Sequence, residues 1–162
     1  MKSKIHEHKK NNLLYVIKKQ ILILFVSLLS ATTFAQAPKH SNLKDNVAIQ
    51  GYDPVAYFES SKATKGKKEI SSEYNGAIYY FSSEGNKALF VKNPSQYIPQ
   101  FGGYCAYGMS EGYEAPIKPE AFTIVNNKLY LNYNLEVKEM WSKEKDTRIK
   151  KADINWEKIK KS

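Results

Sequence analysis

The chain has a single cysteine, Cys105, among its 162 residues. One cysteine cannot form a disulfide within the chain, so a fold held together by internal disulfide bridges is excluded. Histidine is also scarce, with only His6, His8 and His40. A zinc site with four nitrogen or sulfur ligands therefore cannot be assembled unless carboxylates contribute. The possible functions of the chain therefore depend most on the role of Cys105.

Long apolar runs are absent except at residues 21–29. This run follows a segment with six lysines and precedes the small-residue exit Thr33-Phe34-Ala35. A basic start, a short apolar core and a small-x-small exit are typical of a secretory signal peptide. We predict a signal peptide at residues 1–35, cleaved after Ala35, and an exported protein that is periplasmic or secreted and not membrane-bound after cleavage. An uncleaved anchor is the alternative, although the run is shorter than the roughly 20 residues that a membrane span needs.

Basic residues outnumber acidic ones, and more than half of this excess lies in residues 1–35. The whole chain has a net charge of +9, and residues 1–35 hold six lysines and one glutamate. Residues 36–162 therefore carry 19 basic and 15 acidic side chains, a net charge of +4. Nucleic-acid binding requires a basic patch with base-reading groups, and export argues against it, so we expect no nucleic-acid partner.

The pattern of residues 47–162 predicts one small α+β domain with a C-terminal helical extension. Asn75-Gly76 separates two β-prone runs, and Asn126-Asn127 separates two more. Asn-Gly between such runs is the strongest short hairpin signal, because both turn positions need positive φ. We expect these two hairpins to form an antiparallel sheet packed by short helices and by C-terminal helices. The polar residues 36–46 are predicted to be a disordered lead-in, with His40 as a solvated tail residue.

Helix starts are predicted where a short polar side chain precedes a helical pattern. Asp53 comes directly before Pro54, Ser83 precedes a segment with an apolar side, and Asn134 precedes another. Such side chains accept hydrogen bonds from the free N–H groups of a first helical turn. A last helix is expected from about Arg148. For Asp53 the alternative role is that of a metal ligand.

The stretch from Gln100 to Met109 concentrates unusual residues around Cys105. It contains three of the eight glycines of the chain. Glycines gather where the backbone needs positive φ or where another group approaches it closely. We predict a pocket or functional loop here. Its candidate residues are Gly102, Gly103, Tyr104, Tyr107 and Gly108, together with Asp53.

Several segments in order resemble the YHS domain family, in particular its exported, stand-alone members. They are Gly51–Phe58, Tyr74–Pro94 with Tyr97, Gly102–Gly108 and Leu129–Tyr133. The resemblance implies a small α+β domain associated with the handling of heavy metals, without a settled activity. Related metal-associated domains carry cysteines at the end of the core hairpin, where this chain has Ser82 and Ser83. That departure weakens the transfer of a metal site with several cysteines.

A soft-metal site is one interpretation of Cys105. On a helix, Met109 would present its sulfur on the same face four residues later. Thiolate and thioether ligands select Cu(I), so copper bound by Cys105 and Met109, with Met140 or a second subunit as a third ligand, is the candidate cofactor.

Two other interpretations stay open. Cys105 could act as a thiol in redox chemistry or sensing, if a helix N-terminus lowers its pKa. It could also be structural, in a module that binds a partner or a small ligand, since free cysteine is often a small buried hydrophobe. Tyrosines at 97, 104, 107 and 113 could line a pocket for a planar ligand such as haem. No catalytic residue is predicted, and a binding protein is favoured over an enzyme.

Overall fold

The computed structural model describes Lys18 and residues 37–162. Apart from Lys18, the predicted signal peptide at residues 1–35 lies outside the described residues. Within the described part of the chain, no helix combines the length and the apolar character needed to cross a membrane.

The first sheet has four strands in the order β1-β2-β4-β3. Strands β3 and β4 form the predicted hairpin, and its turn residues have the expected positive φ, 50° at Asn75 and 71° at Gly76. Strand β2 pairs with β4 in parallel, so the sheet is mixed. The strands are β1 (Leu43–Lys44), β2 (Val47–Ala48), β3 (Lys67–Tyr74) and β4 (Ala77–Phe81).

The second predicted hairpin is also present, as β5 (Lys118–Val125) and β6 (Lys128–Asn132), with φ of 50° and 58° at Asn126 and Asn127. The α+β class is therefore confirmed. The two hairpins do not join one sheet, however, because β5 and β6 pair only with each other among the named strands. The free side of β6 is instead met by the loop after α4, through parallel bridges at Leu129 and Leu131.

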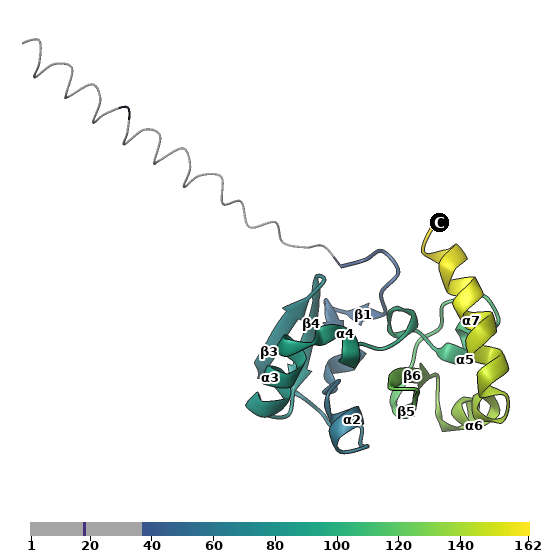
Figure 1. The fold of residues 1–162 in the computed structure, drawn as a ribbon, viewed down its shortest axis with the longest axis horizontal. Helices are drawn as coiled ribbons and strands as arrows, with labels where there is room; N and C mark the ends of the chain where they lie inside the picture. The colour runs from purple at the N-terminus through teal and green to yellow at the C-terminus, as the bar shows by residue number, and fades with distance from the viewer. Residues whose placement is uncertain (1–17, 19–36) are drawn as a thin grey trace, which may run out of the picture. The chain divides into compact units, whose positions relative to one another are not determined.

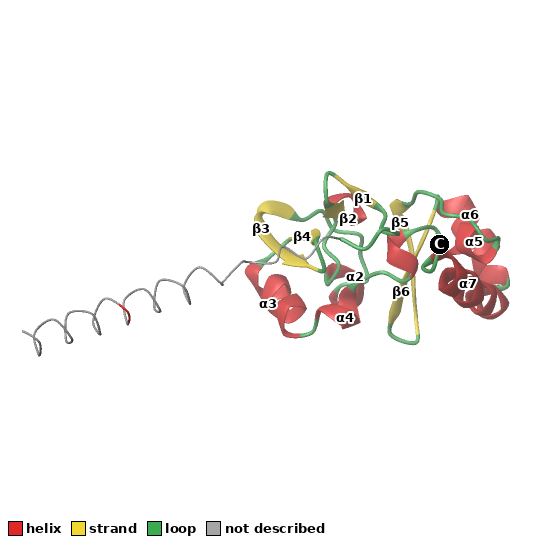
Figure 2. Cartoon of the chain, turned by 90° about the horizontal axis from the view of Figure 1, so that it is seen from above, coloured by secondary structure: helices red, strands yellow, loops and turns green. Residues whose placement is uncertain are grey.

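Helices cover both sheets (Figures 1 and 2). The caps predicted from sequence are confirmed: the side chain of Ser83 accepts from the Asn86 N–H at the start of α3, and Asn134 accepts from Val137 at the start of α6. The last helix, α7, starts at Lys145, whereas we expected it to start at about Arg148. The helices are α2 (Ala56–Glu59), α3 (Glu84–Lys92), α4 (Pro94–Tyr97), α5 (Ala106–Ser110), α6 (Leu135–Lys143) and α7 (Lys145–Ile159), with 3-10 turns η1 (Ile49–Gly51) and η2 (Phe101–Gly103).

Buried apolar side chains form two clusters. One joins the four-stranded sheet to β6 around Phe81 and Phe90, and the other joins α5, α6 and α7 around Trp141. In Figure 2 the four-stranded sheet lies with α3 and α4, and the β5–β6 hairpin lies nearer to α5, α6 and α7. The loop from Pro99 to Cys105 runs between the two clusters, contributing Phe101 to one and Cys105 to the other.

The lead-in differs from the prediction. We expected residues 36–46 to be disordered and His40 to be solvated. Instead β1 lies within this segment, and the side chain of His40, which is only 16% exposed, contacts Glu114 at 2.6 Å. We call residues 38–43 the N-terminal strap. Contacts with residues distant in the sequence order the strap. The prediction of disorder used only the local polar composition, which contains no information on such contacts.

Candidate functional site

Gly102 and Gly103 lie where the N-terminal strap crosses the loop after α4. Both have positive φ, 60° and 83°. A Cβ placed on Gly102 would come within 2.4 Å of the carbonyl oxygen of His40, closer than real Cβ atoms approach any heavy atom. The backbone N–H of Asn42 donates to the Gly102 oxygen at 2.9 Å, and its side-chain amide donates to the Gly103 oxygen at 2.9 Å. The predicted close approach to the glycine pair is thus made by the chain's own strap.

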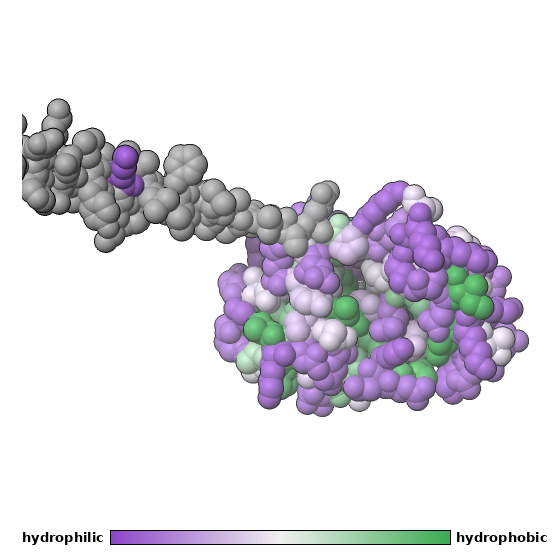
Figure 3. All heavy atoms as spheres, turned by 45° about the horizontal axis from the view of Figure 1, so that its top comes forward, coloured by the Kyte–Doolittle hydropathy of each residue, from purple (hydrophilic) through white to green (hydrophobic). Residues whose placement is uncertain are grey.

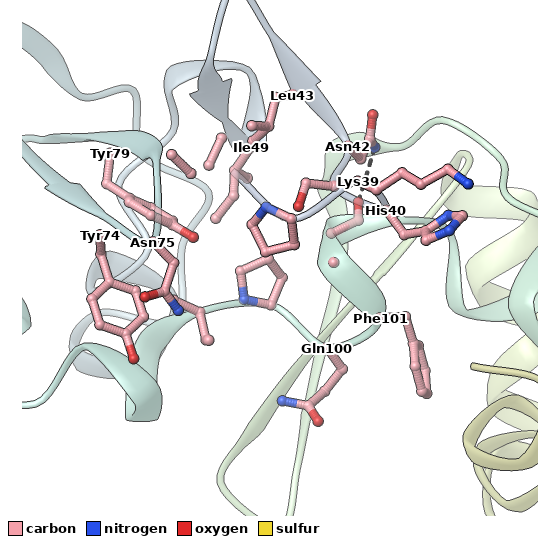
Figure 4. Close-up of a pocket in the computed structure, with 18 of the residues that line it drawn as sticks. Lys39, His40, Asn42, Leu43, Ile49, Tyr74, Asn75, Tyr79, Gln100 and Phe101 are labelled. Carbon is pink, nitrogen blue, oxygen red and sulfur yellow. Dashed lines mark hydrogen bonds between the residues drawn. The ribbon is translucent and has the colours of Figure 1, made fainter. Parts of the chain in front are cut away.

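A groove opens beside this crossing (Figure 4). Its volume is about 480 Å³, within the usual range for small-molecule sites. Its walls come from the strap, the four-stranded sheet, the Pro99–Gly103 loop and α7. The apolar side chains that line it include Leu43, Ile49, Tyr74, Tyr79, Ile98, Pro99, Phe101 and Trp156. None of the described lining residues is an aspartate or a glutamate.

The two ends of the groove differ in chemistry. Tyr74, Asn75 and Tyr79 lie together at one end, and Lys39 and His40 lie at the other (Figure 4). Burial raises the pKa of Tyr79 to about 12, so its hydroxyl stays protonated at neutral pH. That end therefore offers neutral hydrogen-bonding groups.

Cys105 lies outside this groove, in the core. It is 1% exposed and packs within the cluster around Phe81. Its sulfur accepts from the Gly108 N–H at 3.5 Å and lies 3.7 Å from Oδ1 of the buried Asn132. Cys105 precedes α5 as its cap residue, so the expected position at a helix N-terminus is observed. Its local role is to cap the helix with sulfur.

Met109 is fully buried too, but it packs in the other cluster, with Trp141. Cys105 and Met109 are four residues apart, yet they belong to different groups of packed side chains. Met140, the candidate third ligand, is 44% exposed on α6. Among the described residues, no group of three or more histidine, cysteine, aspartate or glutamate side chains is arranged to hold a metal ion.

Asp53 is fully buried and its carboxylate is a hub of five hydrogen bonds. Oδ1 accepts from the N–H groups of Val55 and Ala56 at 2.9 and 3.2 Å, as predicted for a cap. Oδ2 accepts from the N–H and hydroxyl of Ser82 at 2.7 and 2.6 Å and from the Asn86 amide at 2.7 Å. These bonds join the start of α2 to the end of β4 and to α3.

The remaining predicted residues support the packing around α5. A Cβ on Gly108 would lie 3.0 Å from the Tyr113 ring, so glycine is needed there for close packing. The ring of Tyr107 lies 3.9 Å from the guanidinium carbon of Arg148 on α7. Burial, and then the Glu114 carboxylate, raise the pKa of Tyr104. None of the four tyrosines at 97, 104, 107 and 113 lines the groove.

Comparison with known proteins then gives a family. The model of the YHS domain matches residues 55–101. The chain contains a YHS domain. The matched segment begins at Val55, directly before α2. It ends at Phe101 in the wall of the groove, four residues before Cys105. No curated protein and no solved structure matches the chain significantly.

The YHS match bears on the metal that the resemblance implies. The match includes Ser82, and this serine is already hydrogen-bonded to Asp53. Cys105 and Met109 lie beyond the match and are sealed in separate clusters. The described side chains thus do not fit a soft-metal site with several ligands.

Sequence reasoning did not find most of the groove. Leu43, Ile49, Tyr74 and Tyr79 are apolar or aromatic residues of ordinary strands and turns, and nothing local distinguishes them. The glycine pair was the one available signal, because it predicted a close approach. The glycine pair could not identify which segment of the chain would approach it.

Proposed function

We propose that this YHS-domain protein is an exported module that binds a small ligand in the groove beside Gly102 and Gly103. The observation that carries the proposal is the groove itself: it is of ligand size and largely apolar, and it lies where the strap, the YHS segment and α7 meet. Such concave apolar sites with a few polar groups are the usual form of small-molecule sites. Export rests on the predicted signal peptide.

Binding is favoured over catalysis by the groove's side chains. Its described lining includes neither a carboxylate nor a thiol, and its one histidine, His40, contacts Glu114 through Nδ1 while its buried Nε2 has no hydrogen-bond partner among the described residues. Catalysis by a thiol nucleophile or by a carboxylate acid or base has no group to use in this described lining, which leaves His40 as the one imidazole beside a bound substrate. A docking surface for a large partner has less support, because the face in Figure 3 is mostly hydrophilic with small separate hydrophobic patches.

Copper binding by Cys105 and Met109 is a second proposal, which the geometry favours less. Binding would require opening two packed clusters to bring the two sulfurs onto one ion. Elemental analysis of the protein from its native compartment, repeated with Cys105→Ala, tests it. Copper retained by the native protein and lost by the variant would restore this function. A redox role meets the same obstacle, because the thiol is 1% exposed.

The groove is tested with N-phenyl-1-naphthylamine, a neutral dye that fluoresces in apolar sites. We expect the purified chain to bind it with one saturable site, and Leu43→Gln to weaken binding about tenfold by placing an amide in the apolar wall. Fluorescence titration measures both constants.

The matched control is Leu135→Gln on α6, an exposed leucine that does not line the groove. It should leave the binding constant unchanged. Thermal unfolding of both variants checks that they are folded. Equal weakening by the two substitutions, or no saturable binding to the native chain, would contradict the groove as the ligand site.

A further inference from the structure

We propose, on the basis of the function proposed above, that the groove selects an uncharged, ring-containing ligand with one hydroxyl or carbonyl group. The polar group of this ligand meets Tyr79 and Asn75, and its rings lie along the apolar wall. Three sets of observations support this class: the size and apolar lining of the groove, its neutral polar end, and the contacts that its basic residues already make.

The wall favours apolar groups. Leu43 of the strap and Ile49 of η1 line one side (Figure 4). Ile98 and Pro99, from the loop after α4, also line the groove. These side chains leave a half-open space of about 480 Å³, enough for a two- or three-ring molecule. Burying such rings against aliphatic side chains stabilises the complex in proportion to the apolar surface removed from water.

The polar end supplies a hydrogen-bonding pair. The Tyr79 side chain is mostly buried, and neither its hydroxyl nor the Asn75 side chain is hydrogen-bonded to another described residue. Their hydrogen-bonding capacity is therefore available to a ligand. A phenolic hydroxyl can donate or accept, and an amide can do both, so either a ligand hydroxyl or a ligand carbonyl satisfies them.

The basic residues of the wall already contact oxygen atoms of the chain, which disfavours an anionic ligand. Lys160 contacts Glu157 at 2.6 Å, and His40 contacts Glu114 at 2.6 Å. Lys39 donates to the carbonyl oxygen of Ser162 at 3.1 Å, and its side chain runs away from Tyr79 in Figure 4. A charged group entering the groove would lose hydration and would have to compete with these contacts for a counter-charge.

The test uses three naphthalenes of nearly equal shape: 2-naphthol, 2-methylnaphthalene and 2-naphthoate. The dissociation constants for the purified chain are measured by competition with N-phenyl-1-naphthylamine. We expect naphthol to bind about 3- to 10-fold more tightly than methylnaphthalene, the range that one net hydrogen bond provides. We expect naphthoate to bind more weakly than either.

Two variants assign the preference to the polar end. Tyr79→Phe removes one hydroxyl, and Asn75→Gly removes the amide while tolerating the positive φ of that turn position. Each should reduce the advantage of naphthol over methylnaphthalene, and neither should change the constant for methylnaphthalene. This readout separates the hydrogen bond from any general change in stability.

The outcomes separate the two proposals. Tightest binding of naphthoate, or an advantage of naphthol that survives both variants, overturns the ligand class while the groove remains a ligand site. Failure of all three compounds to displace the dye, or of the dye to bind, overturns the groove and the ligand class together.

Discussion

At the scale of single residues, the most connected side chain is not the cysteine but Asp53. Its carboxylate is withdrawn from water and receives five hydrogen bonds from three elements. A buried carboxylate is tolerated only when it is so completely partnered. Ser82 thus acts in this chain as a hydrogen-bond donor that ties the end of β4 to the start of α2.

We predict that Asp53→Asn lowers the free energy of unfolding by about 2–4 kcal/mol, because the amide brings a donor to face groups that are themselves donors. Urea unfolding measures the change. Asp153→Asn, at an exposed position on α7, is the control and should cost less than about 0.5 kcal/mol. Similar losses in the two variants would mean that the Asp53 hub is not a main source of stability.

At the scale of elements, the strap and the glycine pair depend on each other. Gly102 has the conformation and the space that let the strap's backbone pass at hydrogen-bond distance, and Asn42 fixes it there with two bonds. The strap in turn forms one wall of the groove. Its position therefore decides whether the groove exists.

We predict that Gly102→Ala releases the strap, because the added Cβ would collide with the His40 oxygen and with Trp156. Hydrogen exchange at the Asn42 amide should become at least tenfold faster, and binding of N-phenyl-1-naphthylamine should weaken. The control is Gly85→Ala in α3, where a Cβ meets only the Ser83 hydroxyl at 3.7 Å. Unchanged protection of Asn42 in Gly102→Ala would show that the strap is held by other contacts.

The strap and the glycine pair also show which features could be predicted from the sequence and which could not. The hairpin turns and the caps at Asp53, Ser83 and Asn134 were predictable, because each depends on residues within a few positions. The strap was not, since His40 and Glu114 are 74 positions apart, and Asn42 and Gly103 are 61 apart. Cys105 seemed a site because of its rarity, but rarity does not determine burial.

At the scale of the whole molecule, the free energy of unfolding should start to decrease as the pH rises toward 10. Burial raises the pKa of Tyr79 to about 12 and that of Tyr57 further, while tyrosines in the unfolded chain ionise near pH 10. A raised pKa in the folded state gives stability that is complete below about pH 10 and is lost as pH rises toward the folded value.

We predict that Tyr79 alone accounts for a loss of about 2 kcal/mol in unfolding free energy between about pH 9 and pH 12. Tyr79→Phe should flatten the curve by that amount, and Tyr133→Phe, at a half-exposed position, should leave its slope unchanged. Urea midpoints across this range give the slopes. Identical slopes for the native chain and Tyr79→Phe would show that the Tyr79 hydroxyl ionises as readily in the fold as in the unfolded chain.

The contact between Lys39 and the final residue, Ser162, joins positions 123 apart in the sequence at 3.1 Å. The two ends of the described domain are therefore close enough to be fused by a few added residues. A circular permutant with new termini at the exposed Ser60–Ser61 bend should keep its core and would anchor the strap covalently at both sides. Conversely, an affinity tag attached after Ser162 would start beside Lys39, at the rim of the groove, and would compete for the space proposed for the ligand.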